Sequence, residues 1–301
     1  MFRKRAYIAA KQEVTPGTAE TLSGTYAAIN FWNVKHAKVD FGQEEREKQG
    51  SFDRFAATQG ATQATIEFDT EVVGTGATGD VNSILSDLIC ACGYTVAGGV
   101  FTPTSNPASM TTVTIGDYTD GNRRILSGCT GNFTITTTNG RKSMFHFTMT
   151  GIPAAETATA LITPTLPTLV APRGAASFSI NGVTNLRIAQ FTFDSGSQPH
   201  MLESIIAPSG FAFGITDDRM SKATLDPEAT LVSTNDWDTL ITTPTEFALS
   251  VVFGSASHNT ITLAAVGNKA QLKDREYGAR QGVMIDTLNL DLNSGETLTF
   301  A

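Results

Sequence analysis

Two turn dipeptides divide residues 111–150 and constrain the fold more than any other feature of the chain. Asp120-Gly121 and Asn139-Gly140 are residue pairs favoured in tight turns between antiparallel strands, because their backbones accept positive φ. The runs NFTITTT and KSMFHFTMT flank the second turn. Their Thr and Phe side chains pack well on a pleated surface. We therefore expect an antiparallel β-meander here.

Strand patterns recur along the rest of the chain. In residues 62–73, Ile66 and Phe68 alternate with Glu67, Asp69 and Glu71, a period of two typical of a half-buried strand. Further strands are expected at 26–34, 36–41, 176–180, 186–193, 210–215, 222–232, 246–253, 260–266 and 283–292. With 41% hydrophobic residues the chain can bury a core. The predicted fold is mainly β, an antiparallel β-sandwich or partial barrel.

Two segments interrupt the β pattern. Residues 80–92 place six apolar side chains at helical spacing on one face: Val81, Ile84, Leu85, Leu88, Ile89 and Cys92. Asp80 is suited to cap the start of this helix, and Gly93 stands where a terminating glycine belongs. A shorter helix is predicted at 235–242, ended by Pro244.

A weak internal repeat suggests a duplicated chain. ATIEFDTEV (64–72) aligns with ATLDPEATL (223–231), and a helix follows each. The stretch 153–172 contains four prolines and is the best candidate linker. The sequence therefore predicts a first unit at 1–160 with the helix 80–92, and a second at 161–301 with the helix 235–242.

Net charge and cysteine content argue against several classes of protein. A net charge of −8 argues against a protein that grips nucleic acid, because such proteins present a basic surface. Three cysteines without a spaced framework indicate reduced thiols and cytosolic folding. No apolar run follows Arg3, Lys4 and Arg5, so we expect no signal peptide. No window approaches 18 apolar residues, so no membrane span is expected.

The motifs that could carry chemistry are weak. GTGATG (74–79) matches a dinucleotide-binding fingerprint, but an acidic strand precedes it and Asp80 would repel a pyrophosphate. The four histidines are scattered, and Cys90 and Cys92 would point to different sides of one helix. The acidic clusters around Asp217 and Asp274 lie near turns without a pocket signal. We therefore expect no catalytic residue, no cofactor and no metal, and a protein that is not an enzyme.

A mixed-charge segment is the best candidate for contacts between copies. The run EEREK is followed by Phe52 and Phe55 in the segment QGSFDRF. Such a run is most often a solvated turn, and the alternative is a docking loop that meets another copy of the chain. The candidate contact residues are Glu44, Glu45, Arg46, Glu47, Lys48, Phe52 and Arg54. We expect this loop to become ordered only between assembled copies.

Several of these segments, taken in order, resemble the major tail tube proteins of long-tailed bacteriophages. The segments are KQEVTPGTAETLSG, EEREKQGSFDRF, ATIEFDTEVV, LICACGY (88–94) and ITDDRMSKATLDPEATLV (215–232). The resemblance implies a β-sandwich around one helix, copies joined into rings, and rings stacked into a tube that belongs to the virion. It implies no catalytic residues.

The resemblance also defines the expected partners. These are further copies of the chain, in a trimeric pseudo-six-fold or a hexameric ring, and tape-measure, tail-terminator and tail-tip proteins. Double-stranded DNA would pass in transit without specific binding, and assembly would occur in the cytoplasm of the host bacterium. A carbohydrate- or surface-binding β-sandwich, such as an adhesin or a decoration protein, is the alternative. The two tryptophans, Trp32 and Trp237, are expected near the core rather than at a binding loop.

Overall fold

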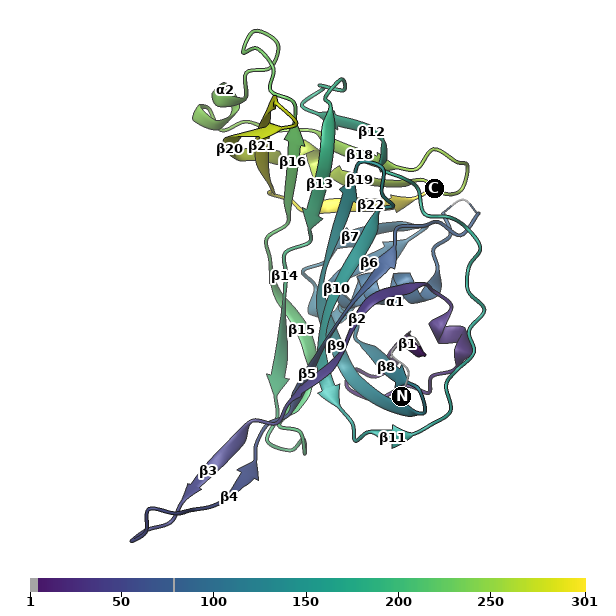
Figure 1. The fold of residues 1–301 in the computed structure, drawn as a ribbon, viewed down its shortest axis with the longest axis vertical. Helices are drawn as coiled ribbons and strands as arrows, with labels where there is room; N and C mark the ends of the chain where they lie inside the picture. The colour runs from purple at the N-terminus through teal and green to yellow at the C-terminus, as the bar shows by residue number, and fades with distance from the viewer. Residues whose placement is uncertain (1–4, 78) are drawn as a thin grey trace.

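A long sheet that contains strands from both halves of the sequence dominates the molecule (Figure 1). The computed structural model describes residues 5–77 and 79–301. Within them, the main path of this 12-stranded sheet runs β17 (Glu246–Phe247), β20 (Ala270–Arg280), β21 (Val283–Leu292), β16 (Lys222–Pro227), β13 (Ile188–Asp194), β9 (Asn122–Thr138), β10 (Met144–Pro153), β5 (Gln63–Glu71) and β2 (Phe31–Asp40). Off this path, β8 (Val113–Thr119) joins β9 to β1 (Ala6–Gln12), and β11 (Thr157–Ala158) pairs with β9.

A second, six-stranded sheet also takes strands from both halves. Its order is β12 (Ala175–Ile180), β18 (Leu249–Phe253), β19 (Ile261–Ala265), β22 (Glu296–Phe300), β7 (Val100–Pro103) and β6 (Tyr94–Ala97). Two hairpins stand apart, β3 (Gln43–Glu47) with β4 (Arg54–Gln59), and β14 (Ser197–Glu203) with β15 (Phe211–Arg219). Short 3₁₀ turns lie at Gly24–Ala27, Pro107–Ser109 and Val266–Asn268. The mainly β, antiparallel sandwich is confirmed, and no closed barrel is present within the described residues.

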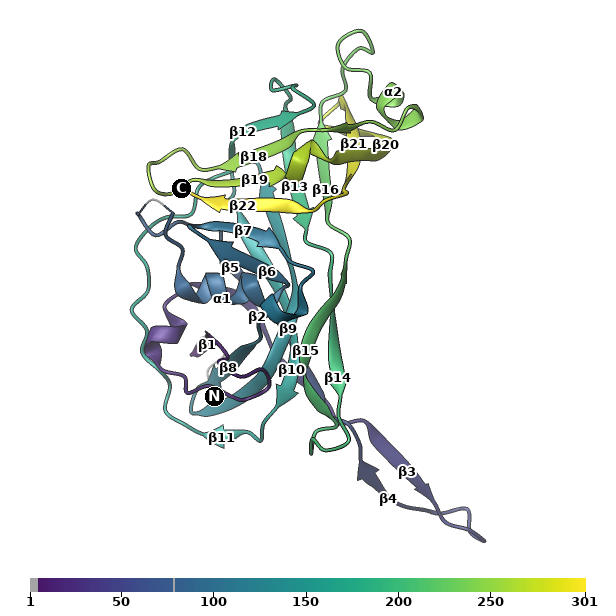
Figure 2. The same ribbon diagram turned by 180° about the vertical axis from the view of Figure 1, so that it is seen from behind.

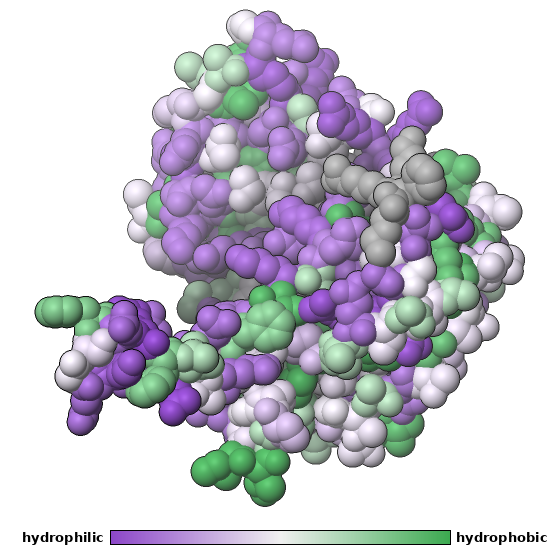
Figure 3. Space-filling model, turned by 60° about the horizontal axis from the view of Figure 1, so that its bottom comes forward, coloured by the Kyte–Doolittle hydropathy of each residue, from purple (hydrophilic) through white to green (hydrophobic). Residues whose placement is uncertain are grey.

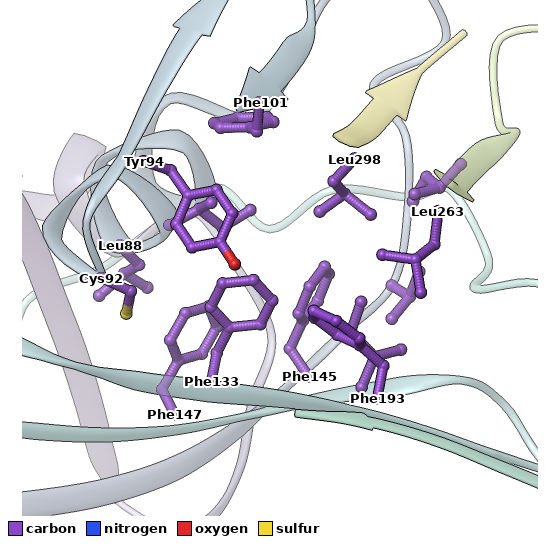
Figure 4. Close-up of a cluster of buried hydrophobic side chains, with 14 of the residues drawn as sticks. Leu88, Cys92, Tyr94, Phe101, Phe133, Phe145, Phe147, Phe193, Leu263 and Leu298 are labelled. Carbon is purple, nitrogen blue, oxygen red and sulfur yellow. The ribbon is translucent and has the colours of Figure 1, made fainter. Parts of the chain in front are cut away.

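The core lies between the two sheets and is rich in aromatic rings. Phe133, Phe145 and Phe147 rise from the main sheet toward Tyr94 and Leu298 of the second sheet (Figure 4). The ring centroids of Phe133 and Tyr94 are 5.3 Å apart, within the favourable range for aromatic pairs. One apolar cluster contains residues from both predicted units. The division of the chain at residue 160 stays a prediction.

The main helix, α1 (Ser83–Ala91), lies beside this core. Ile84, Leu85, Leu88 and Ile89 are buried on one face, as the helical spacing predicts. The predicted start at Asp80 is wrong by three residues. Asn82 is the N-cap, and its side-chain oxygen accepts a hydrogen bond from the Ile84 amide at 3.0 Å.

The second helix, α2 (Trp237–Thr242), is shorter than the predicted 235–242 because the Asp236 side chain caps it. It is tied to the main sheet by a buried charge. Arg275 on β20 contacts Asp286 on β21 at 3.0 Å and Asp238 of α2 at 3.1 Å. The Asp286 side chain is fully buried, and that of Arg275 is 7% exposed. Arg275 therefore neutralises a carboxylate that water cannot reach.

We expect Arg275→Met to destabilise the chain by about 3–5 kcal/mol, because it leaves the buried Asp286 carboxylate without a counter-charge. Chemical denaturation followed by fluorescence measures this loss. The double variant Arg275→Met/Asp286→Asn is the control, and it should recover much of the loss because no buried charge remains. A single variant as stable as the original chain would contradict this account.

Several predicted strands need correction. Residues 24–27 form a 3₁₀ turn, and the strand that was expected at 26–34 begins at Phe31 instead. The strand expected at 222–232 ends at Pro227. The sequence patterns do not predict β1, β3, β4, β6, β7, β11, β14, β20 or β22. Trp237 is buried as expected, but Trp32 is 45% exposed, with the Lys142 ammonium 3.6 Å from its ring.

The main sheet contains two sets of four strands with the same connectivity. The first set consists of β2, β5, β9 and β10, named in sequence order. Across the sheet these strands lie in the order β2-β5-β10-β9. In the second set they are β13, β16, β20 and β21, in the order β13-β16-β21-β20. In both sets a hairpin separates the first two strands, and a helix follows the second. The sets meet where β9 pairs with β13.

Candidate assembly surfaces

The β3–β4 hairpin projects from one end of the molecule, far from the core (Figures 1 and 2). It continues β2 and β5 beyond the main sheet, and every residue from 41 to 59 is exposed. At its base the Gly60 amide donates to the Gly42 carbonyl at 3.0 Å. At its tip the side chain of Phe52 is fully exposed. The hairpin is therefore an exposed surface supported by the hydrogen bonds between β3 and β4.

All seven predicted contact residues belong to this hairpin. Arg54 pairs with Glu45, and both side chains are about two-thirds exposed. The Arg46 guanidinium lies 5.4 Å from the ring centre of Phe55, and the Lys48 ammonium lies 6.0 Å from it. Glu44 and Glu47 have no ion-pair partner among the described residues. The hairpin thus presents both signs of charge around aromatic side chains. That it becomes ordered only between copies stays a prediction.

The face of the main sheet that points away from the core is polar, and its charges are paired across strands. On β5, Glu67 meets the Lys35 ammonium at 2.5 Å, and Glu71 meets that of Lys142 at 2.6 Å. Asp69, between them, accepts hydrogen bonds from Asn33 and His146, both at 2.6 Å. Thr side chains fill much of the rest of this face on β9 and β10. The ionic groups along β5 are therefore held in contacts within the chain.

At both edges of the main sheet, the outermost strand has backbone N–H and C=O groups with no partner strand among the described residues. Among the described residues, β2 pairs only with β5 at one edge. At the other edge, β17 covers only Ala270 and Gln271 of β20, so residues 273–280 have no outer strand. Unpaired strand edges are templates for further pairing. Neither edge is wholly bare, since α2 packs against β20 and the Asp117 side chain accepts a hydrogen bond from the Ala37 amide of β2 at 3.1 Å.

An apolar hairpin tip that the sequence patterns do not predict lies at the same end as the β3–β4 hairpin. The tip of the β14–β15 hairpin exposes Ile205 and Ile206 almost completely, at 105% and 89%. Figure 3 views this end of the molecule and shows apolar groups standing out from a mostly polar surface. Sequence patterns gave no signal for it, because two apolar residues in a turn match neither the strand nor the helix period.

The glycine-rich loop at 74–79 is held by contacts with a distant part of the chain. In the loop 74–79 the Gly74 amide donates to the Asn259 side chain at 2.8 Å, and the Gly76 amide donates to the His258 carbonyl at 3.2 Å. These amides are therefore engaged and do not face a phosphate. Thr78 lies outside the described residues, as do Arg3 and Lys4. Asp217 lies 3.8 Å from His200 on an exposed hairpin.

Residues 5–77 and 79–301 contain no group of three or more His, Cys, Asp or Glu side chains placed to hold a metal ion. No helix in those ranges combines the length and the apolar character needed to cross a membrane. Cys90, Cys92 and Cys129 are free and buried.

These features define a structural β-protein with open sheet edges and a projecting hairpin. The family model described as phage tail tube protein matches residues 3–300. The chain therefore belongs to the phage tail tube protein family, and it is a structural component of the virion. Comparison with curated proteins gave no match.

Proposed function

We propose that copies of this chain close side by side into a ring whose polar sheet face lines a channel for DNA. The observation that carries the proposal is the pair of open edges, β2 on one side of the main sheet and β20 on the other. Pairing β2 of one copy with β20 of the next closes the sheet and leaves no edge exposed. The mixed-charge β3–β4 hairpin then reaches from one ring to the next.

Ring size follows from the strand count. Each chain supplies two sets of four strands, so three chains give 24. At a spacing of ~4.8 Å and a tilt of ~40°, 24 strands close a barrel about 48 Å across at the backbone, or roughly 35–40 Å between inward side chains. A DNA duplex passes through such a channel. The matched connectivity of the two sets supports a duplicated chain and a trimeric ring with pseudo-six-fold symmetry; a hexameric ring is the rival.

Electron microscopy of the purified chain, alone and with tail-tip proteins as nucleators, tests this assembly. We expect rings or tubes at high concentration, because the sheet edges and the hairpin are unsatisfied in the single chain. A protein that stays monomeric at high concentration even with its tail partners would overturn the proposal. The same experiment addresses the adhesin alternative, which no observation favours.

The channel is expected not to bind DNA. With a net charge of −8 and paired ionic groups on the polar sheet face, the chain offers few free cations to displace the counterions of DNA. Fluorescence anisotropy should therefore detect no duplex binding at micromolar protein in physiological salt. Micromolar binding that weakens as salt is added would contradict a passive channel.

Family membership supports further tail proteins as partners. Tail-terminator and tail-tip proteins would cap the two ends of the tube, and a tape-measure protein would occupy the channel during assembly. Folding in the cytoplasm of the bacterial host is supported by three buried, unpaired cysteines, because secreted proteins more often join theirs. No catalytic role, cofactor or metal is proposed.

A further inference from the structure

The tip of the β14–β15 hairpin is an unpartnered apolar surface. Ile205 and Ile206 stand at its end, with the partly exposed Leu202 and the exposed Pro208 beside them. We call these four residues the tip patch. The tip is held rigidly, since the Ser204 amide donates to the Gly210 carbonyl at 2.9 Å and the Thr62 amide to the Ser209 carbonyl at 2.8 Å. A fixed turn that exposes two isoleucines to water indicates a surface that another molecule covers.

A second apolar surface lies at the opposite end of the molecule (Figure 1). Leu231 and Val232, beyond β16, are 77% and 61% exposed, and Val283 and Met284, at the β20–β21 turn, are 46% and 59% exposed. We call these four residues the distal patch. The segments that carry them are joined at their base, where the Ala229 amide donates to the Met284 carbonyl at 2.9 Å. Both patches belong to the second set of four strands.

The charges beside the two patches are opposite. Glu203 is exposed next to the tip patch. Arg187 lies beside the distal patch, with its carbonyl accepting from the Glu228 amide at 3.0 Å; its guanidinium is 3.5 Å from the Glu228 carboxylate, and its side chain is 82% exposed. Surfaces that match in both apolar character and charge, and that lie at opposite ends of one chain, produce head-to-tail association that repeats without closing. That is the geometry of a stack.

The β14–β15 hairpin also occupies the same place in the second strand set as the β3–β4 hairpin does in the first. Each hairpin connects the first two strands of its set, and both point to the same end of the molecule (Figures 1 and 2). Their chemistry differs, since β3–β4 is charged and the β14–β15 tip is apolar. Burial of apolar surface contributes more per contact than an exposed ion pair does.

We propose that the tip patch of each chain docks on the distal patch of a second copy in the adjoining ring, as an apolar contact separate from the charged β3–β4 hairpin. The inference rests on the proposed stacking of rings. It assigns the two hairpins different tasks: β14–β15 supplies an apolar contact between rings, and β3–β4 supplies charge pairing.

Cross-linking of assembled tubes tests the contact. The variant Ile206→Cys/Met284→Cys places one thiol in each patch, and a short bismaleimide joins thiols that lie close together. The native cysteines are buried, and burial raises the pKa of Cys90 to about 11, so they compete little. We expect a ladder of bands at multiples of the 31.9 kDa chain that extends past the size of one ring. Contacts within a ring would end the ladder at the ring size.

Each single-cysteine variant is a control and should give no ladder. A complementary variant, Ile205→Asp/Ile206→Asp, should reduce tube yield by more than roughly tenfold while rings persist. Val14→Asp/Val170→Asp changes two other exposed valines, away from both patches, and should leave tube yield unchanged.

The outcomes separate this inference from the proposed function. Tubes of the cysteine pair that yield no ladder, or a ladder that stops at one ring, overturn the contact alone. Cross-links to a tail-tip or tape-measure protein in place of a second copy overturn it too. Failure of the unmodified chain to form any tube, even with nucleators, removes the proposed stacking and this inference together.

Discussion

The double variant Arg46→Glu/Lys48→Glu is expected to form rings of normal mass that do not stack into tubes. Both side chains lie on the exposed β3–β4 hairpin, where they contact only the Phe55 ring among the described residues. The fold therefore does not depend on them. Reversal leaves the hairpin with acidic residues alone except for Arg54, so every copy in a ring would repel an acidic neighbour.

The loss of affinity between rings is large because the same two reversed charges occur on every chain of a ring. An exposed ion pair contributes about 0–1 kcal/mol, so two reversed positions on each of three chains cost about 3 kcal/mol per ring junction. That corresponds to roughly a hundredfold loss in ring-to-ring affinity. Negative-stain electron microscopy gives the tube length, and circular dichroism checks the fold.

The conservative variant Arg46→Lys/Lys48→Arg is the matched control, because it keeps both charges at the same positions. It should form tubes of ordinary length. Added salt should shorten the tubes of the unmodified chain, since exposed charges are screened within about 10 Å at 0.1 M ionic strength. Tubes of normal length from the reversed variant would refute the assignment of this hairpin to ring contacts.

Local features of the fold could be predicted because they have local causes. The spacing of apolar residues predicts the buried face of α1, and Asn139-Gly140 predicts the turn between β9 and β10. The cap of α1 was misplaced because Asp80 and Asn82 are both good capping residues. Only the backbone geometry decides between them, since the Asn82 oxygen reaches the Ile84 amide.

Long-range pairing could not be predicted from the same patterns. A period of two tells which face of a strand is buried but does not tell which strand lies beside it. The pairing of β9 with β13 joins Thr136 to Thr192 across the proline-rich segment, and neither residue signals the other. The charge run predicts the candidate contact residues. It does not predict that their hairpin projects from the molecule, because this depends on the pairing of β2 with β5 at the base of the hairpin. The apolar tip at Ile205 and Ile206 gave no periodic signal at all.

An isolated ring is expected to have a mass of roughly 96 kDa, from three copies of the 31.9 kDa chain, against about 191 kDa for six. This expectation rests on the topology of the main sheet rather than on the similarity between the segments 64–72 and 223–231. Each chain contributes two four-stranded sets with the same connectivity, joined edge to edge where β9 pairs with β13. If six four-stranded units line the channel, a chain that supplies two of them needs three copies, which together contribute 24 strands.

Six copies would give 48 strands in the wall, and at the same spacing and tilt a barrel about 96 Å across. Such a wall would leave a channel far wider than a DNA duplex requires. Native mass spectrometry of rings released from tubes measures the copy number, and a tube reconstruction measures the symmetry. A three-fold ring whose density repeats approximately every 60° is the expected result. True six-fold symmetry with one chain per unit would show that only one of the two sets lines the channel and that the other decorates the outside.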